Sequence, residues 1–386
     1  MKIKEVRTVV LPPRPVPKTP PRRPSWWEKW RVASPMTRYP RYAPFRPDWF
    51  PRWGRFGVVV VTDDGSAGFA VGAHGKPVAT VIEEYLGPRI VGEDCMATEK
   101  TYDMMVRLCA PFGATGLASF AVSAIDLALW DLKGKLLGKP VYELLGGRTY
   151  DDIPCYMTGN DPDWAIELGF EGIKLACPYG PHDGLDGLRR NVTLVQETRE
   201  LIGPARELML DCWMALDVEY TVRLAEELRP FKLAWLEECL PSEDIGGHMV
   251  LRERLPWQTL ATGEHWFTPY PFQFAAERHL VDIIQPDIVW VGGMTAMLRI
   301  YALAEAAGVT FTPHVGANDP YGQHACYGLP GIRWAEWSSP VPPGVPLAEM
   351  SAYPGMAVPS RGRLKPTDAP GFGVDFEPSR LDAFLR

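Results

Sequence analysis

The sequence has no apolar run that approaches the ~20 residues needed to cross a bilayer, so we expect neither an integral membrane protein nor a membrane partner. Its first residues, MKIKEVRTVVLPP, lack the apolar core of a signal peptide, which predicts a cytoplasmic protein. The chain also lacks an excess of basic residues, because its formal net charge is −7. Nucleic-acid binding depends on neutralising phosphates, so we expect a small-molecule partner and no nucleic acid.

Cysteine pairs with the CxxC spacing of metal and redox sites are absent as well. The seven cysteines are an odd number, and four of them fall in or beside short apolar runs: Cys155, Cys177, Cys212 and Cys239. Free cysteines in such positions behave as small buried apolar side chains. We therefore expect reduced thiols with no catalytic or metal-binding role.

The first hundred residues differ from the rest of the chain. After an opening strand, KIKEVRTVVL, residues 12–57 are dense in proline, arginine and tryptophan and show no helical or strand period. Two interpretations of this segment are possible. It is either a polyproline ligand or basic arm that binds an acidic partner, or an active-site lid. The lid is favoured, because long irregular stretches inside compact proteins are usually binding loops and FGVVVVTDDGSAGFAVG predicts a hairpin that anchors the far end.

A regular alternation of apolar runs and amphipathic stretches follows the predicted helix GLASFAVSAIDLALWDLKGKLLGKPVYELLGG. The apolar runs cover residues 153–159, 172–177, 207–213, 233–240, 260–265, 281–289, 309–315 and 333–337. Stretches such as DVEYTVRLAEELRPF between them are long enough for crossover helices. Eight strands alternating with helices predict an α/β fold with a parallel, TIM-like (β/α)8 barrel.

Successive predicted strands end on polar side chains: Asp211, Glu237, Glu264, Asp287, His314 and Glu336. The carboxyl ends of barrel strands form one rim, so we expect these side chains to converge on one mouth. Three carboxylates on consecutive strands (Asp211, Glu237 and Glu264) would repel one another unless a cation lay between them, and all-oxygen ligation suits Mg²⁺. Strand alternation assigns Glu237 to this site and predicts that Glu238 points away from the metal.

His314 and Asp287 lie on neighbouring strands at the same level. An aspartate beside an imidazole orients the ring and raises its basicity, which suits a general base. We therefore predict a catalytic pair. The histidines without such neighbours, which are predicted to be structural, are His74, His248, His279 and His324.

These residues resemble the enolase superfamily in its mandelate racemase subgroup, from AIDLALWDLKGKLLGKPVYELLGG to the tail GRLKPTDAPGFGVDFEP. Within the subgroup, GFEGIKLACPYGPHDG, MLDCWMALDVEY, WLEECLP, TGEH and DIIQPDIVWVGGMT are similar to L-rhamnonate dehydratase and related acid-sugar dehydratases. The resemblance implies an α+β capping domain over 1–120, joined by the tail at about 355–386, and a catalytic barrel over 121–354. It also implies a homo-oligomer, with an octamer as one form.

The resemblance assigns roles by position. Asp211, Glu237 and Glu264 correspond to Mg²⁺ ligands, His314 with Asp287 to the acid/base pair, and Glu336 to a carboxyl that contacts the substrate carboxylate. The residues that it places near the substrate are Arg46, His265, Lys174 and, in place of a capping-loop histidine that this chain lacks, Trp27 or Trp30.

The implied reaction is that of a hydro-lyase, in which His314 removes the C2 proton of a sugar acid and the 3-hydroxyl leaves to give a 2-keto-3-deoxy acid. Racemases of the subgroup carry a second lysine base where this chain has Ala176, in IKLAC, which favours dehydration. Two alternatives remain at this stage. One is a racemase, epimerase or cycloisomerase of another carboxylate, and the other is a non-catalytic scaffold that binds partners through the Pro/Arg-rich segment.

Overall fold

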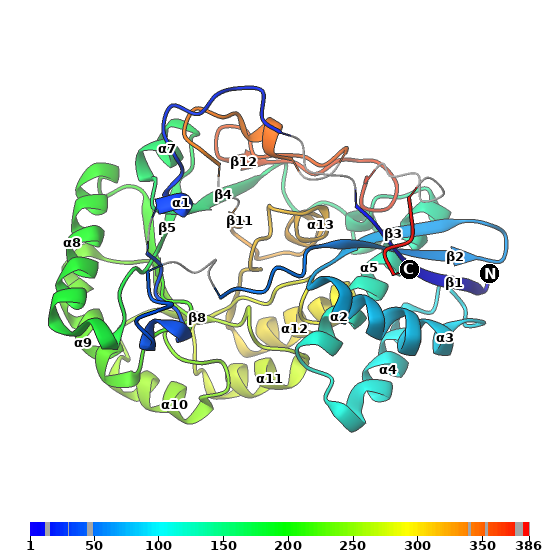
Figure 1. The fold of residues 1–386 in the computed structure, drawn as a ribbon, viewed down its shortest axis with the longest axis horizontal. Helices are drawn as coiled ribbons and strands as arrows, with labels where there is room; N and C mark the ends of the chain where they lie inside the picture. The colour runs from blue at the N-terminus through cyan, green and yellow to red at the C-terminus, as the bar shows by residue number, and fades with distance from the viewer. Residues whose placement is uncertain are drawn as a thin grey trace.

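The computed structural model describes residues 1–11, 16–29, 31–44, 49–338, 341–351, 354–374 and 381–385. It has two sheets, a small antiparallel one near the termini and a large parallel one that curls around a central mouth (Figure 1). Of the helices that the structure describes, none combines the length and apolar character that a membrane span requires.

The capping sheet pairs β1 (Ile3–Val9), β2 (Phe56–Thr62) and β3 (Ala67–Gly72) in that order, all antiparallel. The opening strand and the hairpin expected from the sequence are therefore confirmed. Helical segments that follow β3 complete this unit: α2 (Gly75–Thr80), the π-helix η3 (Val81–Leu86), α3 (Gly87–Ile90), α4 (Thr98–Cys109) and the 3-10 turn η4 (Ala110–Phe112).

The long helix α5 (Leu117–Leu137) packs directly on the capping sheet. It is buried on nearly all sides, and a Cβ added to Gly68 of β3 would lie 2.0 Å from the carbonyl oxygen of Ala128. Only glycine permits this approach. The division expected between residues 120 and 121 falls inside this helix and stays a prediction.

All eight predicted parallel strands are confirmed. They are β4 (Ile153–Thr158), β5 (Gly172–Ala176), β6 (Glu207–Asp211), β7 (Trp235–Glu237), β8 (Leu260–Thr262), β9 (Ile283–Ile284), β10 (Thr310–Phe311) and β11 (Ala335–Trp337). They pair in the order β10-β9-β8-β7-β6-β5-β4-β11, and β12 (Arg363–Leu364) adds antiparallel to β4. Within the described chain no ladder joins β10 to β11, so the sheet is a curled, incompletely closed barrel.

In Figure 1 the helices α8, α9, α10 and α11 lie around the outside of this barrel. The helices in this part of the chain are α6 (Val141–Leu144), α7 (Pro162–Glu167), α8 (Gly184–Ile202), α9 (Val218–Leu228), α10 (Ile245–Arg254), α11 (Pro269–Arg278), α12 (Gly293–Ala307) and α13 (Pro320–Gly328), with the 3-10 turns η5 (Pro181–Asp183), η6 (Arg229–Phe231) and η7 (Leu347–Met350). All seven cysteines are free and buried, as expected.

The proline- and arginine-rich segment contacts the rim of the barrel. We call its described residues, 16–29 and 31–44, the lid segment; it contains α1 (Trp26–Lys29) and the 3-10 helix η1 (Pro35–Arg38). The main-chain N–H of Trp26 donates to Asp161 (2.9 Å), and that of Ala33 donates to the carbonyl of Cys177 (2.8 Å). In Figure 1 the lid segment, in dark blue, runs beside the ends of the green barrel strands.

Candidate active site

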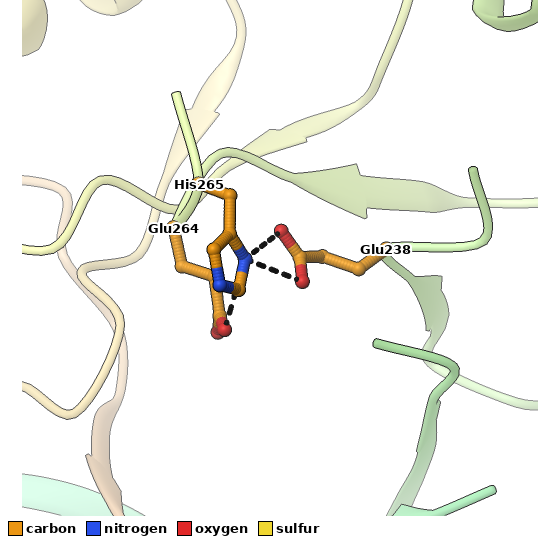
Figure 2. A group of neighbouring side chains, drawn as sticks. All are labelled: Glu238, Glu264 and His265. Atoms are coloured by element: carbon orange, nitrogen blue, oxygen red, sulfur yellow. Dashed lines mark hydrogen bonds and ion pairs between the residues drawn. The ribbon is translucent and has the colours of Figure 1, made fainter. Parts of the chain in front are cut away.

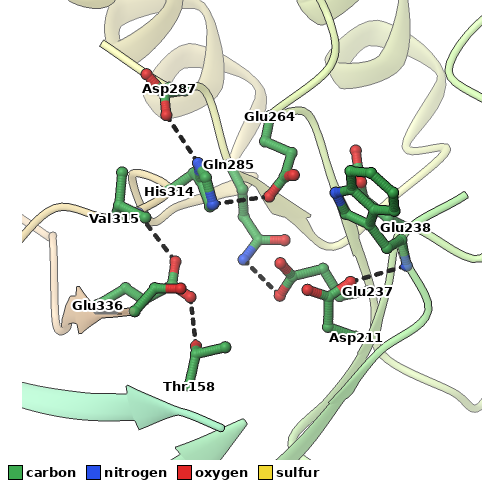
Figure 3. Close-up of polar contacts among 12 residues, drawn as sticks. Thr158, Asp211, Glu237, Glu238, Glu264, Gln285, Asp287, His314, Val315 and Glu336 are labelled. Atoms are coloured by element: carbon green, nitrogen blue, oxygen red, sulfur yellow. Dashed lines mark hydrogen bonds and ion pairs between the residues drawn. The ribbon is translucent and has the colours of Figure 1, made fainter. Parts of the chain in front are cut away.

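The polar strand ends converge on the mouth of the barrel. Asp211 ends β6 and pairs in register with Glu237, the last residue of β7, while Glu264 follows β8 by two residues. Figure 3 shows the three carboxylates directed toward the same space, with His314 and Glu336 across from them. The sequence prediction that these groups meet is therefore consistent with the structure.

Lys174 of β5 lies among these carboxylates. Its ammonium forms a close ion pair with Glu237, lies 2.9 Å from a carboxylate oxygen of Glu336 and is 3.8 Å from Asp211. Burial acts to lower the pKa of Lys174, but the surrounding carboxylates outweigh it and raise the pKa well above its usual value. A fully buried, charged lysine thus stabilises part of the negative charge at the strand ends.

One lysine does not balance the acids. Burial raises the pKa of both Asp211 and Glu237 to about 7, and neighbouring carboxylates add to this effect while Lys174 opposes it. For Glu264, burial also acts to raise the pKa, but His314 and His265 outweigh it and lower the pKa. Lys174 therefore neutralises only part of the negative charge at the strand ends, and a further cation would stabilise these carboxylates.

Glu238 is not directed away from this cluster, and that prediction is wrong. The main chain at Glu238 has φ 44°, so the extended backbone, and with it the alternation of side chains, ends at Glu237. Both carboxylate oxygens of Glu238 lie 2.9 Å from Nδ1 of His265, which is also 3.3 Å from Glu264 (Figure 2). One ligand atom from each of Glu238, Glu264 and His265 fits within 4.8 Å of the others, as in a metal-binding group.

His265 is thus a partner of two acids. Burial acts to lower the pKa of His265, but Glu238 and Glu264 raise it to about 9. The position expected for it, beside the third acid at the mouth, agrees with the structure, while a substrate contact stays a prediction.

His314 lies between two carboxylates. Its Nδ1 is 2.8 Å from Asp287, and its Nε2 is 2.9 Å from Glu264 (Figure 3). The other oxygen of Asp287 accepts the main-chain N–H of Val289 (2.7 Å), which fixes the carboxylate. Burial acts to lower the pKa of His314, but Glu264 and Asp287 raise it well above its usual value. This is the geometry of an oriented acid/base imidazole.

Glu336 of β11 is held by three donors. It accepts the main-chain N–H of Val315 (2.9 Å) and the hydroxyl of Thr158, and it pairs with Lys174. Burial acts to raise the pKa of Glu336, but Lys174 and His314 lower it. The carboxylate therefore faces the mouth in its charged form.

A cavity of about 240 Å³ opens beside these groups. Its lining combines site residues with aromatic and apolar side chains: Trp26, Trp27, Val32, Thr158, Ala176, Asp211, Trp213, Glu264, Trp290, His314, Val315, Asn318, Glu336 and Ser338. Trp27 is therefore placed at the pocket. Arg46 and Trp30 lie outside the described residues, so their expected roles are not addressed by the structure.

Comparison with known proteins identifies the family. The family described as "Enolase C-terminal domain-like" matches residues 163–380, and the N-terminal domain of "Mandelate racemase / muconate lactonizing enzyme" matches residues 55–146. The chain belongs to this family. The two matched domains correspond to the capping sheet and the curled barrel described above.

Three members of the family are informative. An L-rhamnonate dehydratase of Saccharopolyspora erythraea is 38% identical over 356 residues, which cover 91% of each chain. The structure of rhamnonate dehydratase from Gibberella zeae complexed with Mg has a TM-score of 0.91 and 32% identity, covering 99% of this chain and 96% of that one. A racemase from Streptomyces coelicolor with bound magnesium has a TM-score of 0.77 and 26% identity, covering 98% of each chain. Within the enolase superfamily, the chain is a lyase of the rhamnonate dehydratase type.

The enolase superfamily is dependent on divalent metal ions, and the donor set of this chain fits such a cation. The cluster offers buried carboxylate oxygens from consecutive strand ends, the ligands that Mg²⁺ prefers, and the raised pKa values of Asp211 and Glu237 show that its negative charge is incompletely compensated. Cysteine thiols are not part of the cluster that the described residues form.

Sequence reasoning missed several residues at the mouth of the barrel. Gln285 donates to Glu237 (2.9 Å), and Trp290 contacts the rings of His265 and His314, each with centroids 5.3 Å away. Gln285 precedes Asp287 by two positions, so strand alternation contained a signal for it. Trp26 and Val32 had no such signal, because they come from an aperiodic segment.

Proposed function

We propose that this enzyme is a Mg²⁺-dependent dehydratase of an aldonic acid, L-rhamnonate or a close relative, and that it forms a 2-keto-3-deoxy acid. The names of two similar proteins support the substrate class. The observation that carries the reaction type is a single oriented base: His314 is held by Asp287, while Ala176 occupies the strand-end position where a second lysine base would stand.

His314 performs both proton transfers in this proposal. Its Nε2 takes the proton from C2, and the imidazolium formed then protonates the departing 3-hydroxyl on the same side. Asp287 keeps the proton of Nδ1 in place during both steps. When bound, Mg²⁺ supplies a positive charge that stabilises the developing negative charge on the substrate carboxylate.

The proposed metal ligand Glu264 also affects the protonation of the proposed base His314. Glu264 is the main group that raises the pKa of His314, so a cation bound by Glu264 would reduce this effect and would favour the neutral imidazole that a base requires. Lys174 adds a fixed positive charge beside Glu336, where the substrate carboxylate is expected.

We assign the metal to Asp211, Glu237 and Glu264. The adjacent Glu238 provides a matched comparison, since both glutamates are buried at the mouth. Glu237→Gln and Glu238→Gln are isosteric, and titration calorimetry with Mg²⁺ measures each. We expect Glu237→Gln, which removes a charged ligand, to lose much more affinity for Mg²⁺ than Glu238→Gln. The reverse order would assign the metal to the group of Glu238, Glu264 and His265.

The reaction is tested with a panel of aldonic acids. The protein is incubated with Mg²⁺ and each acid, and 2-keto-3-deoxy products are assayed with and without a chelator. We expect metal-dependent turnover of L-rhamnonate or a stereochemical relative. Solvent deuterium at C2 of recovered substrate, without loss of water, would instead indicate a racemase.

A further inference from the structure

The proposed base His314 borders two cavities. The active-site cavity of about 240 Å³ and a second cavity of about 290 Å³ both have the side chains of His314 and Trp290 in their linings. A ring beside open space is not held by dense packing, so individual contacts must fix its orientation. Orientation matters for a base, because a displacement of about 1 Å can slow an enzyme about 100-fold.

The main chain at His314 is fixed on both sides. The N–H of His314 donates to the carbonyl of Pro286 (3.1 Å), and the N–H of Val315 donates to Glu336 (2.9 Å). The freedom that remains is rotation of the imidazole ring.

Two acids contact the ring nitrogens of His314, but only one of them can hold the ring during the proposed reaction. Nδ1 lies 2.8 Å from Asp287 and Nε2 lies 2.9 Å from Glu264. In the proposed reaction Nε2 faces C2 of the substrate and Glu264 binds the cation, so the bond to Asp287 remains. One hydrogen bond fixes the position of Nδ1 and still allows the plane of the ring to tilt. A further contact is therefore needed on the ring itself.

We propose that Trp290 is the positioning residue that supplies this contact and keeps His314 directed toward C2 of the substrate. The inference rests on the proposed function, because it takes His314 to be the base. The rings of Trp290 and His314 have centroids 5.3 Å apart and planes at 49°, a separation at which aromatic rings attract each other. Trp290 contacts the ring of His265 with the same distance and angle, so one indole lies against both imidazoles that contact Glu264.

Trp290 and Asp287 belong to one turn of the main chain after β9. The carbonyl of Asp287 accepts the N–H groups of Trp290 (3.0 Å) and Val291 (2.9 Å), and its carboxylate accepts that of Val289. The residue that bonds Nδ1 of His314 and the residue that contacts its ring are thus held together. A shift of this turn would move both contacts at once.

Helix α5 holds this turn and the start of α12 through three buried polar side chains, which lie on one face of the helix: Ser119, Ser123 and Asp126. The hydroxyl of Ser119 donates to the carbonyl of Trp290, and that of Ser123 accepts the N–H of Gly292 (2.8 Å). Asp126 accepts the main-chain N–H (3.0 Å) and the hydroxyl (2.6 Å) of Thr295.

The same helix also contacts the ring of Trp290. Phe120 meets it edge to face, with centroids 5.8 Å apart and planes at 82°. Helix α5, which packs on the capping sheet, therefore holds both the main chain and the ring of the residue that contacts the base.

The first test changes the ring. Trp290→Leu removes the aromatic contact, whereas Trp290→Phe keeps a ring at this position. The substrate is L-rhamnonate, or the stereochemical relative that the wild-type enzyme turns over fastest, with Mg²⁺. We expect Trp290→Leu to lower kcat about 10- to 100-fold, and Trp290→Phe to recover most of this loss. Mg²⁺ affinity, measured by calorimetry, should stay close to that of wild type in both variants.

The kinetic isotope effect identifies the step that is slowed. With substrate deuterated at C2, the isotope effect on kcat should be at least as large in Trp290→Leu as in wild type, because removal of the C2 proton is the slow step. A smaller isotope effect, or a raised KM with kcat within about threefold of wild type, would overturn the inference. The second result would mean that Trp290 only contacts the substrate. Equal losses of kcat in Trp290→Phe and Trp290→Leu would also overturn it.

The second test changes α5 at a residue that does not reach the substrate. Ser123 is fully buried and lines neither cavity, so Ser123→Ala acts only through the bond to Gly292. We expect kcat to fall about two- to tenfold with KM unchanged.

Asp131→Asn is the matched control, because Asp131 also lies on α5 and accepts main-chain N–H groups, those of Phe69 and Phe372, away from this turn. Both variants should lose stability in urea, but only Ser123→Ala should lower kcat. Equal losses of kcat would overturn the role of α5 in the inference. A wild-type enzyme that turns over no aldonic acid would overturn the proposed function itself, and the inference with it.

Discussion

Each buried charge of the active site is stabilised by identified neighbours at the scale of single residues. His314 is the clearest case, because one ring nitrogen contacts Asp287 and the other contacts Glu264. The two carboxylates have different tasks: Asp287 also accepts a main-chain N–H and is fixed in place, whereas Glu264 belongs to the proposed metal site. The role of His314 therefore depends on a neighbour that can be changed without altering the metal ligands.

Asp287→Asn tests this dependence. The amide oxygen can still accept the N–H of Val289, but the amide nitrogen then donates toward Nδ1 of His314 and favours the wrong tautomer. We expect kcat to fall about 10²- to 10⁴-fold, with Mg²⁺ affinity within threefold of wild type. Steady-state kinetics and calorimetry measure both, and a kcat within twofold of wild type would contradict the assigned role.

His324 makes a second prediction at this scale, on stability. Its Nδ1 accepts the main-chain N–H of Tyr142 (3.2 Å), and burial lowers its pKa to about 3, so the folded protein holds it neutral. In the unfolded chain its pKa is about 6.5. The unfolded state thus binds an extra proton as pH falls below about 6.5, and this residue alone costs about 2 kcal/mol of stability by pH 5.

His324→Asn keeps an acceptor near Nδ1 and removes the titration. Urea denaturation between pH 7 and 4 should show a smaller loss of unfolding free energy for the variant than for wild type. Parallel pH profiles for the two proteins would show that His324 is not the titrating group.

At the scale of elements, the barrel strands place polar side chains at the mouth, and the lid segment lines the rest of the pocket. The lid segment carries cations, and the loop after β4 carries acids. Arg23 pairs closely with Asp161 and lies 2.7 Å from Asp163, and Asp161 also bonds the main chain of Trp26. Arg23 is therefore placed to hold the segment that supplies Trp26 to the pocket.

Arg23→Gln should loosen this contact. Because Arg23 is partly exposed, its ion pairs are screened by solvent and each is weak. We expect KM to rise about two- to fivefold with kcat unchanged, and the lid segment to be cut faster in limited proteolysis. Arg22→Gln is the matched control, since Arg22 pairs with Glu167 through two side chains that are each more than half exposed. Equal changes in KM and in proteolysis for the two variants would show that Arg23 has no specific role in holding the lid segment.

At the scale of the whole molecule, the capping unit and the C-terminal tail meet on α5. Buried Asp131 accepts the main-chain N–H of Phe69 in β3 (2.8 Å) and that of Phe372 in the tail (2.9 Å). It also pairs with Lys135 at 2.7 Å. One carboxylate thus joins segments that are far apart in the sequence. The homo-oligomer that the family resemblance implies stays a prediction, which light scattering would test.

Asp131→Asn should destabilise this junction. An amide has one acceptor oxygen, so one of the two main-chain N–H groups loses its bond and faces a donor. We expect a loss of about 2 kcal/mol in the free energy of unfolding, measured in urea. Lys135→Met removes only the partly exposed ion pair and should cost less than about 1 kcal/mol. Similar losses in the two variants would mean that the ion pair, and not the main-chain bonds, holds the junction.

The sequence by itself determined the strands, their polar ends and the family. Apolar runs and their spacing are local properties, and all eight strands follow from them. The meeting of Asp211, Glu237, Glu264 and His314 also followed, because parallel strands end at one rim.

Tertiary structure alone decided which further side chains join the strand-end residues at the mouth of the barrel. Glu238 turns into the site because the strand ends one residue earlier, Lys174 is surrounded by acids of other strands, and Trp26 and Val32 enter from a segment without periodicity. Each of these placements depends on contacts between distant parts of the chain, which no local pattern of residues encodes.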